Sequence, residues 1–355
     1  MVSITAAKKN RMIIYTKPFK MIKRIAYPIG QGAFYSETHF CDDKKFTIVY
    51  DCDSTTSVDI LEKEIKHSGI KEIDVLVLSH FHKDHFNGFN IIKDLKITVK
   101  RLIMPNLDHE DIVLYSYEND EFYSFYTNLQ SMFENCKVTK VSASSAGEDN
   151  EPSVDIESLE KSLFHNKNVK IFNGFDWIIK FYVDKNVYDQ KLTNDEKQLL
   201  STIDMTDFEN NKSKIKDIYE KINKDLNLIS MCMYSGPYEI DFWIPRWFDY
   251  IFFGKNYIFG TMLTGDILLN DENRISAFVK HYKNFLGLIN CFQIPHHGSH
   301  DNMIRVINEF NLKKSFIQAG EFNKYGHPAY PIVNMHRKNS ISTKVITEYS
   351  KPFCF

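Results

Sequence analysis

The sequence predicts a layered α/β fold. Short apolar runs without helical spacing, which are typical of buried strands, occur at 75–78, 227–234 and 257–266. Segments with an apolar face at helical spacing precede the first of these runs, at 57–69, and follow the last, at 272–285. Because strands that alternate with helices at this spacing pack as layers, the chain is expected to form an α/β layered sheet.

Length and composition agree with a folded globular protein. The chain has 355 residues, of which 43% are apolar and 14% aromatic, enough for one large domain or two small ones. Its longest uncharged apolar run falls short of the roughly 18 residues that a membrane helix needs. Lysines and arginines interrupt every apolar stretch before Tyr27, so the start of the chain lacks a signal-peptide pattern. The expected location is the cytoplasm.

Charge and cysteine usage weigh against two further classes of protein. The net charge of −2 and pI near 6.7 give the whole chain no electrostatic footprint for nucleic acid, so such a partner would need a local basic patch. The six cysteines show no paired spacing, which is typical of reduced, mostly buried thiols and weighs against a secreted enzyme.

The N-terminal part combines a basic segment with a predicted hairpin. Residues 1–24 carry seven basic and no acidic side chains, which favours a solvated leader over a binding arm. Two strands of a hairpin are predicted at 25–36 and 46–54, and Asp51 stands at the end of the second strand.

The next elements continue the alternation of helices and strands. The helix at 57–69 has Gly69 as its stop signal, and a second helix is predicted from 88 to 95. A strand at 97–104 ends at Pro105, and 112–134 reads as one aromatic-rich amphipathic helix.

Residues 142–225 differ in character from the rest. They contain seventeen acidic and twelve basic residues, with a loose stretch at their start and a helical segment from about 195 to 226. This pattern suggests an acidic, helical insertion around a core strand at 177–183. Such an insertion could cap a site, or it could be a surface decoration without a chemical role.

A cluster of metal-binding side chains follows the apolar run at 75–78. Three histidines and a carboxylate occur within six residues, and alternate side chains of an extended or turning backbone can point into one pocket. A lone histidine at a strand end is usually a surface or core residue, but four such side chains together favour a site for zinc, iron or manganese. The cluster consists of His80, His82, Asp84 and His85.

Two later strands also end in potential ligands. The run at 257–266 ends in Thr264-Gly265-Asp266, where a carboxylate could bridge two metals, although the same tripeptide is a common turn. The segment at 290–294 leads into Pro295-His296-His297-Gly298-Ser299. Chance adjacency of two histidines is common, but two such clusters, each at the end of a strand, favour one shared metal site.

The loop at 80–85, followed by Gly88, resembles the HxHxDH signature of the metallo-β-lactamase-fold hydrolases. Together with further motifs, the resemblance extends over residues 28–346 to the hydrolase domain of ComEC-type DNA-uptake competence proteins. These motifs are Gly30-Gln31-Gly32, Asn227 with Ser230, Thr264-Gly265-Asp266, Pro295 to Ser299, and Asn323 to Pro328.

The resemblance implies a four-layer αββα sandwich with helical and acidic insertions. It places residues 25–355 in a single domain that carries the insertion at about 142–225. Asp51 would be a structural carboxylate that orients the metal loop, although a plain turn aspartate fits its position equally well.

The resemblance also implies two divalent metal ions, zinc first and manganese as the alternative. The ligands would be His80, His82, Asp84, His85 and Asp266, with His296 or His297 completing the second site. The histidine that most members of the superfamily have between the HxHxDH loop and the bridging aspartate has no counterpart here, where the strand offers Asn227 and Ser230. The first metal is therefore expected to be short of one protein ligand.

A metal-activated water is the expected nucleophile, and the assigned catalytic residues are Asp84, Asp266 and His327. Ser299, His300 and His327 are the candidates for contact with phosphate. Each has a simpler explanation: Ser299 as a helix cap, His300 as a surface residue, and His327 as a turn histidine before proline.

Three functions fit these residues. The first is a metal-dependent phosphodiesterase or nuclease acting on DNA, RNA or a nucleotide second messenger, which the motifs favour. The second is a hydrolase of a small ester, lactone, thioester or amide, since one fold hosts many chemistries. The third is a metal-binding interaction module or partner-controlled effector that contacts a protein through its insertions.

Overall fold

The strands of the chain form two large sheets. The computed structural model describes residues 20–41, 43–82, 88–143, 153–171, 177–185, 192–222, 229–238, 259–300 and 309–355. Within these ranges each large sheet has eight strands, and β4 (Glu72–Ile73) pairs with β6 (Thr98–Val99) in a separate two-stranded ribbon.

The first sheet is antiparallel at one side and parallel at the other. Its strand order is β10-β8-β7-β5-β3-β2-β1-β18. The strands β1, β2 and β3 pair antiparallel, whereas β3, β5, β7 and β8 run parallel, so their carboxyl ends meet at one edge. The bounds are β1 (Lys20–Ala26), β2 (Gly32–Cys41), β3 (Lys44–Ser54), β5 (Val75–Val77), β7 (Arg101–Pro105), β8 (Lys137–Ser142), β10 (Ser162–Phe164) and β18 (Phe353–Cys354).

The second sheet has the same mixed character. Its order is β17-β16-β15-β14-β13-β12-β11-β9, and β14, β15, β16 and β17 run parallel to one another. The bounds are β9 (Val154–Asp155), β11 (Asn168–Lys170), β12 (Trp177–Lys185), β13 (Ile229–Pro237), β14 (Gly260–Leu263), β15 (Ile289–Gln293), β16 (Lys314–Gln318) and β17 (Ser342–Ile346).

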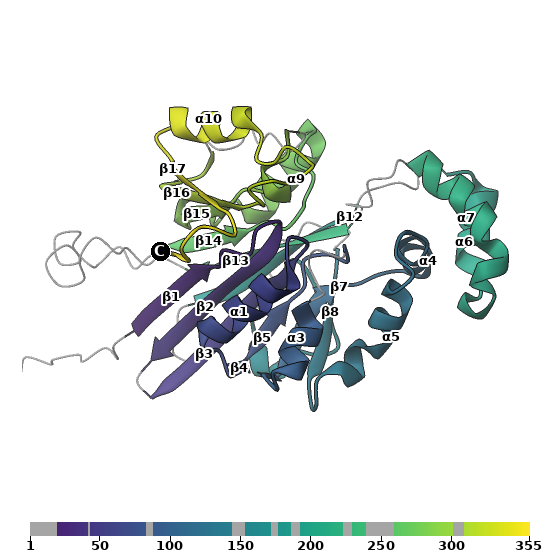
Figure 1. Cartoon of the computed structure of the whole chain (residues 1–355), viewed down its shortest axis with the longest axis horizontal. Helices are drawn as coiled ribbons and strands as arrows, with labels where there is room; N and C mark the ends of the chain where they lie inside the picture. Colours follow the sequence, from purple (N-terminus) through teal and green to yellow (C-terminus); the bar gives the residue numbers. More distant parts are fainter. Residues whose placement is uncertain are drawn as a thin grey trace, which may run out of the picture.

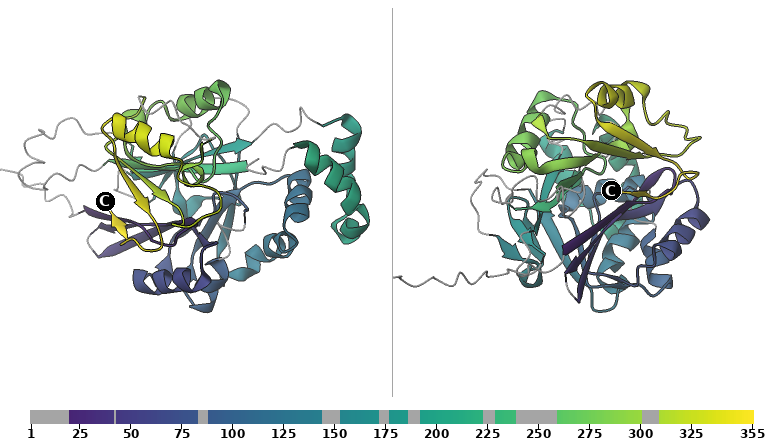
Figure 2. Two further views of the ribbon diagram at one scale, coloured as in Figure 1. Left: turned by 45° about the horizontal axis from the view of Figure 1, so that its top comes forward. Right: turned by 90° about the vertical axis from the view of Figure 1, so that its left-hand side faces the viewer.

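Helices cover the outer faces of the stacked sheets, which gives the four-layer αββα order that was predicted. In Figures 1 and 2 the helices α1 and α3 lie on the side of the first sheet, whereas α9 and α10 lie on the side of the second. The α-helices are α1 (Val58–Ser68), α3 (Gly88–Asp94), α4 (His109–Glu118), α5 (Phe122–Met132), α6 (Asn194–Thr202), α7 (Phe208–Ile222), α9 (Glu272–Tyr282) and α10 (Tyr330–Lys338). Single 3-10 turns are η1 (Ile156–Ser158), η3 (Met205–Asp207), η4 (Leu286–Leu288) and η5 (His296–Gly298).

The central strand β13 of the second sheet is buried on both faces. Successive side chains of a strand point to opposite sides, so its residues divide between two cores. In β13, Met231 and Met233 belong to the core shared with the first sheet, whereas Cys232 and Tyr234 belong to a second cluster under α9 and α10. Such a strand reads as a continuous apolar run, which explains why no alternation was visible in the sequence.

Hydrogen bonds fix the two sheets against each other. The Tyr50 hydroxyl on β3 donates to the Met231 carbonyl on β13 at 2.6 Å. The Gln318 amide on β16 donates to the carbonyls of Tyr27 and Phe34, at 2.8 and 2.9 Å. Because the sheets are locked in this way, residues at the ends of strands from both sheets can form one site.

Three predicted elements were wrong in their extent. The single helix at 112–134 is two helices, α4 and α5, because Asn119 leaves the helical conformation with φ of −138° and its side chain accepts a hydrogen bond from the Glu121 amide. The strand at 97–104 is divided between β6 and β7, which belong to different sheets. The strand at 25–36 is divided between β1 and β2 by the segment 27–31.

The described parts of the predicted leader and insertion contribute to the sheets. Residues 1–19 lie outside the described residues, and Lys20 to Arg24 form the first part of β1. Residues 142–225 supply edge strands to both sheets together with α6 and α7, which pack on α4 through contacts such as that between the Tyr117 and Tyr219 rings at 5.1 Å. In the described parts of the chain, every helix is too short or too polar to cross a membrane.

Candidate metal centre

Two strands from different sheets end at the same place and bring metal-ligand atoms together. His80 and His82 follow β5 of the first sheet, and Asp266 follows β14 of the second. One ligand atom from each of these three side chains lies within 4.8 Å of the other two. His80 and Asp266 are almost fully buried, with 0% and 3% exposure, so the group is held inside the protein.

Asp266 lies between histidines from both halves of the molecule. Its Oδ2 atom is 3.7 Å from His80 Nε2 and also 3.7 Å from His296 Nε2. A carboxylate in this position can donate one oxygen to each of two neighbouring ions. The predicted convergence of the His80 loop, Asp266 and the His296 segment is therefore present in the structure.

A hydrogen-bond relay fixes the His80 ring. Asp51 accepts hydrogen bonds from the Ser79 amide and the Ser79 hydroxyl, both at 2.7 Å, and the same hydroxyl oxygen lies 2.9 Å from His80 Nδ1. Because the single hydroxyl proton goes to Asp51, the Ser79 oxygen must accept from Nδ1–H. The Nε2 atom of His80, which faces Asp266, is then left with its lone pair, as metal binding requires.

The turn that carries Asp266 is fixed from the neighbouring strand. Gln293 Oε1 accepts from the Thr264 amide at 3.0 Å, and the Thr264 hydroxyl donates to the Gln293 carbonyl at 2.8 Å. Gly265 adopts a left-handed conformation with φ of 52°, and a Cβ atom there would lie 2.7 Å from the Ser79 side chain. Only glycine allows the two loops to approach this closely.

His296 and His297 occupy a left-handed turn. Their φ angles are 50° and 53°, an unfavourable conformation for residues with a side chain. Hydrogen bonds from the His296 amide to the Gly265 carbonyl, and from the Ser299 amide to the His296 carbonyl, fix the turn at 3.0 and 2.8 Å. Backbone strain that is over-determined in this way clusters at functional sites.

The two adjacent histidines have different surroundings. The His296 ring faces Asp266, as described above, whereas Nδ1 of the buried His297 donates to the Gln318 carbonyl at 2.8 Å. A carbonyl oxygen can only accept, so Nδ1 carries the proton in His297. Of the two, His296 is the side chain that the structure places beside the Asp266 carboxylate.

The three candidates for phosphate contact lie around this turn. The His327 ring is 5.5 Å from the His296 ring and 6.2 Å from the His297 ring, measured between centroids. Ser299 is buried, with 7% exposure, and His300 is exposed. The structure thus brings the His327 ring to the two histidines of the turn, buries Ser299 directly after them and leaves His300 at the surface.

The donor set fits a divalent ion. Among the described residues the buried Nε2 atom of His82 has no hydrogen-bond partner, and it lies 3.7 Å from Glu118 Oε1. A buried imidazole nitrogen is costly unless something occupies it. Two imidazoles and one carboxylate are ordinary ligands for zinc or manganese, so an ion here would remove that cost.

Some predicted residues lie outside the described residues. These include Asp84 and His85, which fall within residues 83–87, and Asn227. Ser230 is described: its hydroxyl is buried, has no hydrogen-bond partner in the described residues and lies beside Gly265. Ser230 is therefore next to the centre but offers only a hydroxyl.

The sequence did not reveal three residues that shape the centre. Ser79 connects Asp51 to His80, and only its place directly before His80 could have signalled this. Gln293 fixes the turn before Asp266 through a contact between two strands. Glu118 ends α4 and approaches His82, and nothing in the local sequence of that helix indicates its position.

Comparison with known proteins gives little further information. No family model matches the chain, and no curated protein matches its sequence. A solved structure that resembles it is that of unliganded yeast PDE1, with 9% sequence identity and a TM-score of 0.46, over 94% of this chain and 100% of that chain. The chemistry open to the site therefore follows from its own donor atoms.

Proposed function

We propose that this protein is a metal-dependent hydrolase that cleaves phosphodiesters, as a phosphodiesterase or nuclease. The observation that supports this most is the convergence of His80, His82 and Asp266 from the ends of two different sheets, with their ligand atoms within 4.8 Å. Buried clusters of this composition are costly to maintain without an ion.

The three side chains would hold one divalent ion, and Asp266 would be shared with a second site that includes His296. The resemblance seen in the sequence implies that Asp84 and His85 are further ligands of the two ions. A bound divalent ion supplies Lewis acidity and lowers the pKa of water toward neutrality. Asp51 and Ser79 keep His80 in the tautomer that exposes Nε2.

A phosphodiester is the proposed substrate because a further imidazole, that of His327, lies next to the histidine turn of the centre. The His327 ring lies 5.5 Å from the ring of His296, which itself faces Asp266, and an imidazole N–H can donate to a phosphate oxygen. A neutral ester offers a single carbonyl oxygen and would need fewer such donors.

The test uses the full chain loaded with zinc or with manganese. Hydrolysis of bis(p-nitrophenyl) phosphate and of p-nitrophenyl butyrate is measured for the parent and for Asp266→Asn and His82→Gln. We expect phosphodiester hydrolysis to fall by about 100-fold or more in both variants and to stop in excess chelator. Asp59→Asn and His67→Gln, which change exposed side chains of α1, are the matched controls and should leave it unchanged.

Each other outcome has a meaning. Unchanged turnover in excess chelator would contradict a metal-dependent reaction. Cleavage of the ester without the phosphodiester would favour the small-molecule hydrolase. Stoichiometric metal binding without turnover of either compound would favour the interaction module.

A further inference from the structure

A large cavity lies at the edge of the first sheet opposite the metal centre. Its volume is about 1380 Å³, and its lining includes the first residues of three parallel strands: Lys44 of β3, Arg101 of β7 and Lys137 of β8. The metal centre lies beyond the carboxyl end of β5 in the same sheet. The five residues of β7 alone span about 17 Å, so the cavity is a separate site.

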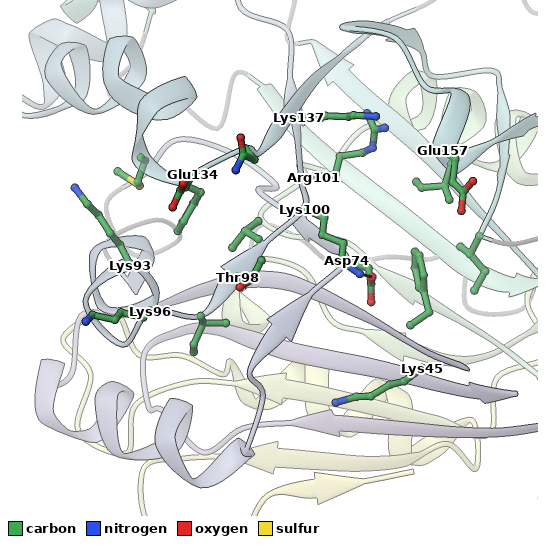
Figure 3. Close-up of a pocket in the computed structure, with 18 of the residues that line it drawn as sticks. Lys45, Asp74, Lys93, Lys96, Thr98, Lys100, Arg101, Glu134, Lys137 and Glu157 are labelled. Atoms are coloured by element: carbon green, nitrogen blue, oxygen red, sulfur yellow. Dashed lines mark hydrogen bonds and ion pairs between the residues drawn. The ribbon is translucent and has the colours of Figure 1, made fainter. Parts of the chain in front are cut away.

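The charge of the lining is unbalanced. It contains seven basic side chains, six of which are labelled in Figure 3, and three acidic ones. Lys100 is neutralised by Glu72 and Asp74, at 2.7 and 2.8 Å. In the described residues the other five lysines have no carboxylate within ion-pair distance; they are Lys44, Lys45, Lys93, Lys96 and Lys137.

Arg101 distinguishes this cavity from a solvated basic surface. It is only 5% exposed, and its guanidinium donates to the Thr139 hydroxyl at 2.8 Å and to the Leu159 carbonyl at 3.2 Å. Both partners are neutral, and no described carboxylate pairs with it. This burial lowers the pKa of the Arg101 guanidinium.

The sheet register makes the arrangement still less favourable. Arg101 and Lys137 are paired positions on neighbouring strands. Like charges directly opposite each other in a sheet are destabilising, and a buried charge without a counter-ion is more costly still. An anion in the cavity would reduce both costs, and a guanidinium is well suited to phosphate.

Apolar side chains form another part of the lining. Val99 and Phe133 are buried, with 1% and 5% exposure, and Ile97, Met132 and Ile171 also line the cavity. A ligand that fills this space would therefore combine a polyanionic part with a flat or apolar part.

We infer that this cavity binds a nucleoside polyphosphate, whose phosphates lie near Arg101 and Lys137 and whose base packs on the apolar part of the lining. This inference does not depend on the proposed hydrolase activity. The ligand is a compact molecule and not a nucleic-acid chain, because Asp74, Glu134 and Glu157 interrupt the basic lining and would repel a continuous phosphate backbone.

The test measures binding of ATP to the full chain by calorimetry in excess chelator at physiological salt. Chelator removes divalent ions from the metal centre, and Asp266→Asn is expected to bind ATP like the parent. The double variant Lys45→Gln with Lys137→Gln should weaken binding by about tenfold or more, which corresponds to about 1.4 kcal/mol. The matched control, Lys214→Gln with Lys313→Gln, removes the same charge from exposed positions outside the cavity and should change affinity by less than about twofold.

Arg101→Met gives a second measurement. We expect it to remove the rise in melting temperature caused by ATP without lowering the melting temperature of the ligand-free chain, because an uncompensated buried charge is replaced by an apolar side chain. The lysine variants keep the inference testable if this variant fails to fold.

The remaining outcomes would overturn the inference. One such outcome is that ATP does not bind saturably. Another is that the cavity variant and the control lose the same amount of ATP affinity. Inorganic triphosphate that binds as tightly as ATP would overturn the role of the apolar lining. Tighter binding of a single-stranded oligonucleotide would overturn the choice of a compact ligand.

Discussion

Asp51 is buried in a left-handed backbone conformation, with φ of 50°, under the loop that carries the metal ligands. Its carboxylate accepts both available hydrogen bonds from Ser79, and Ser79 in turn fixes the tautomer of His80. Asp51 thus orients His80 indirectly, through the side chain of Ser79. Hydrogen-bond partners of metal-binding histidines commonly have this role.

We expect Asp51→Asn to weaken zinc binding by about 10-fold to 100-fold while the chain stays folded. Asparagine tolerates the left-handed conformation, but an amide oxygen and an NH₂ group cannot accept both hydrogen bonds from Ser79. Competition with a chromogenic chelator measures the affinity. Asp59→Asn, at an exposed position, is the control, and equal affinities in the two variants would contradict the role of Asp51.

Gly265 sets the distance between the two loops of the centre. A methyl group here would meet the Ser79 side chain at 2.7 Å and would also require a left-handed conformation. We expect Gly265→Ala to lower the free energy of unfolding by about 1–3 kcal/mol and to displace Asp266, which reduces zinc occupancy.

Gly287→Ala is the control for this substitution, because a Cβ atom there meets nothing within 4 Å. Urea unfolding and metal analysis of both variants check the expectation. If both alanines were tolerated equally, the close approach at Gly265 would not constrain the centre.

At the residue scale the sequence indicates which side chains meet but not how they are held. His80, His82 and Asp266 were predicted because their residue types and positions after apolar strands are local signals. The choice between His296 and His297 was not predictable, because it depends on the left-handed turn and on contacts with Gly265 and Gln318, which are far away in the sequence.

The helix α1 illustrates how local signals define an element. Ser57 caps its start by accepting a hydrogen bond from the Ile60 amide at 3.3 Å, and Gly69 ends it in a left-handed conformation with φ of 69°. Both ends agree with the helix predicted at 57–69, since capping chemistry is encoded within a few residues.

Ser57→Ala should lower the free energy of unfolding by about 1 kcal/mol, because the cap hydrogen bond to the first turn is lost. The measurement is urea unfolding followed by circular dichroism. Ser276→Ala, at an exposed position within α9, removes a hydroxyl without a capping role and should be neutral or slightly stabilising. A loss of similar size in both variants would rule out the cap as the cause.

Elements whose limits depend on tertiary contacts were not predictable in the same way. The segment from 97 to 104 was predicted as one strand because most of its residues are apolar, yet it is divided near Lys100 and Arg101 into β6 and β7, which join different sheets. The aromatic residues from 112 to 134 keep helical spacing across the break at Asn119, because both α4 and α5 contribute to one aromatic cluster around Phe81. Hydrophobic periodicity reports burial, and it does not report which layer buries the residue.

At the scale of the whole molecule, a buried ionic network links the two sheets. Glu37 on β2 is fully buried and accepts hydrogen bonds from Arg24 at 3.0 Å and from Ser235 of β13 at 2.6 Å. Burial by itself would raise the pKa of Glu37, but Arg24 and His39 outweigh it and hold this pKa well below the usual range. The Glu37 carboxylate is charged and hydrogen-bonded. Removal of one partner would therefore lower the free energy of unfolding by far more than the intact pair contributes to it.

Buried groups with shifted pKa values make the stability of the fold depend on pH in opposite directions. Burial lowers the pKa of His336 from 6.5 to about 4, and it raises the pKa of Asp184 to about 6. Below pH 6.5 the unfolded chain binds a proton at His336 that the folded chain does not, so acid destabilises the fold. Asp184 has the opposite effect between pH 6 and its unfolded pKa near 4, since there the folded chain binds more protons.

The variant His336→Leu separates the two effects. His336 is 1% exposed on α10. Because the folded chain keeps this side chain neutral, the free energy of unfolding should fall by about 3 kcal/mol as the pH is lowered from 7 to 4. Urea unfolding in chelator across this range should therefore give a flatter pH profile for His336→Leu than for the parent. His67→Leu, at an exposed position of α1, should keep the parent profile. Parallel profiles for His336→Leu and the parent would show that this histidine has the same pKa in the folded and the unfolded chain, since only a difference between the two states makes stability depend on pH.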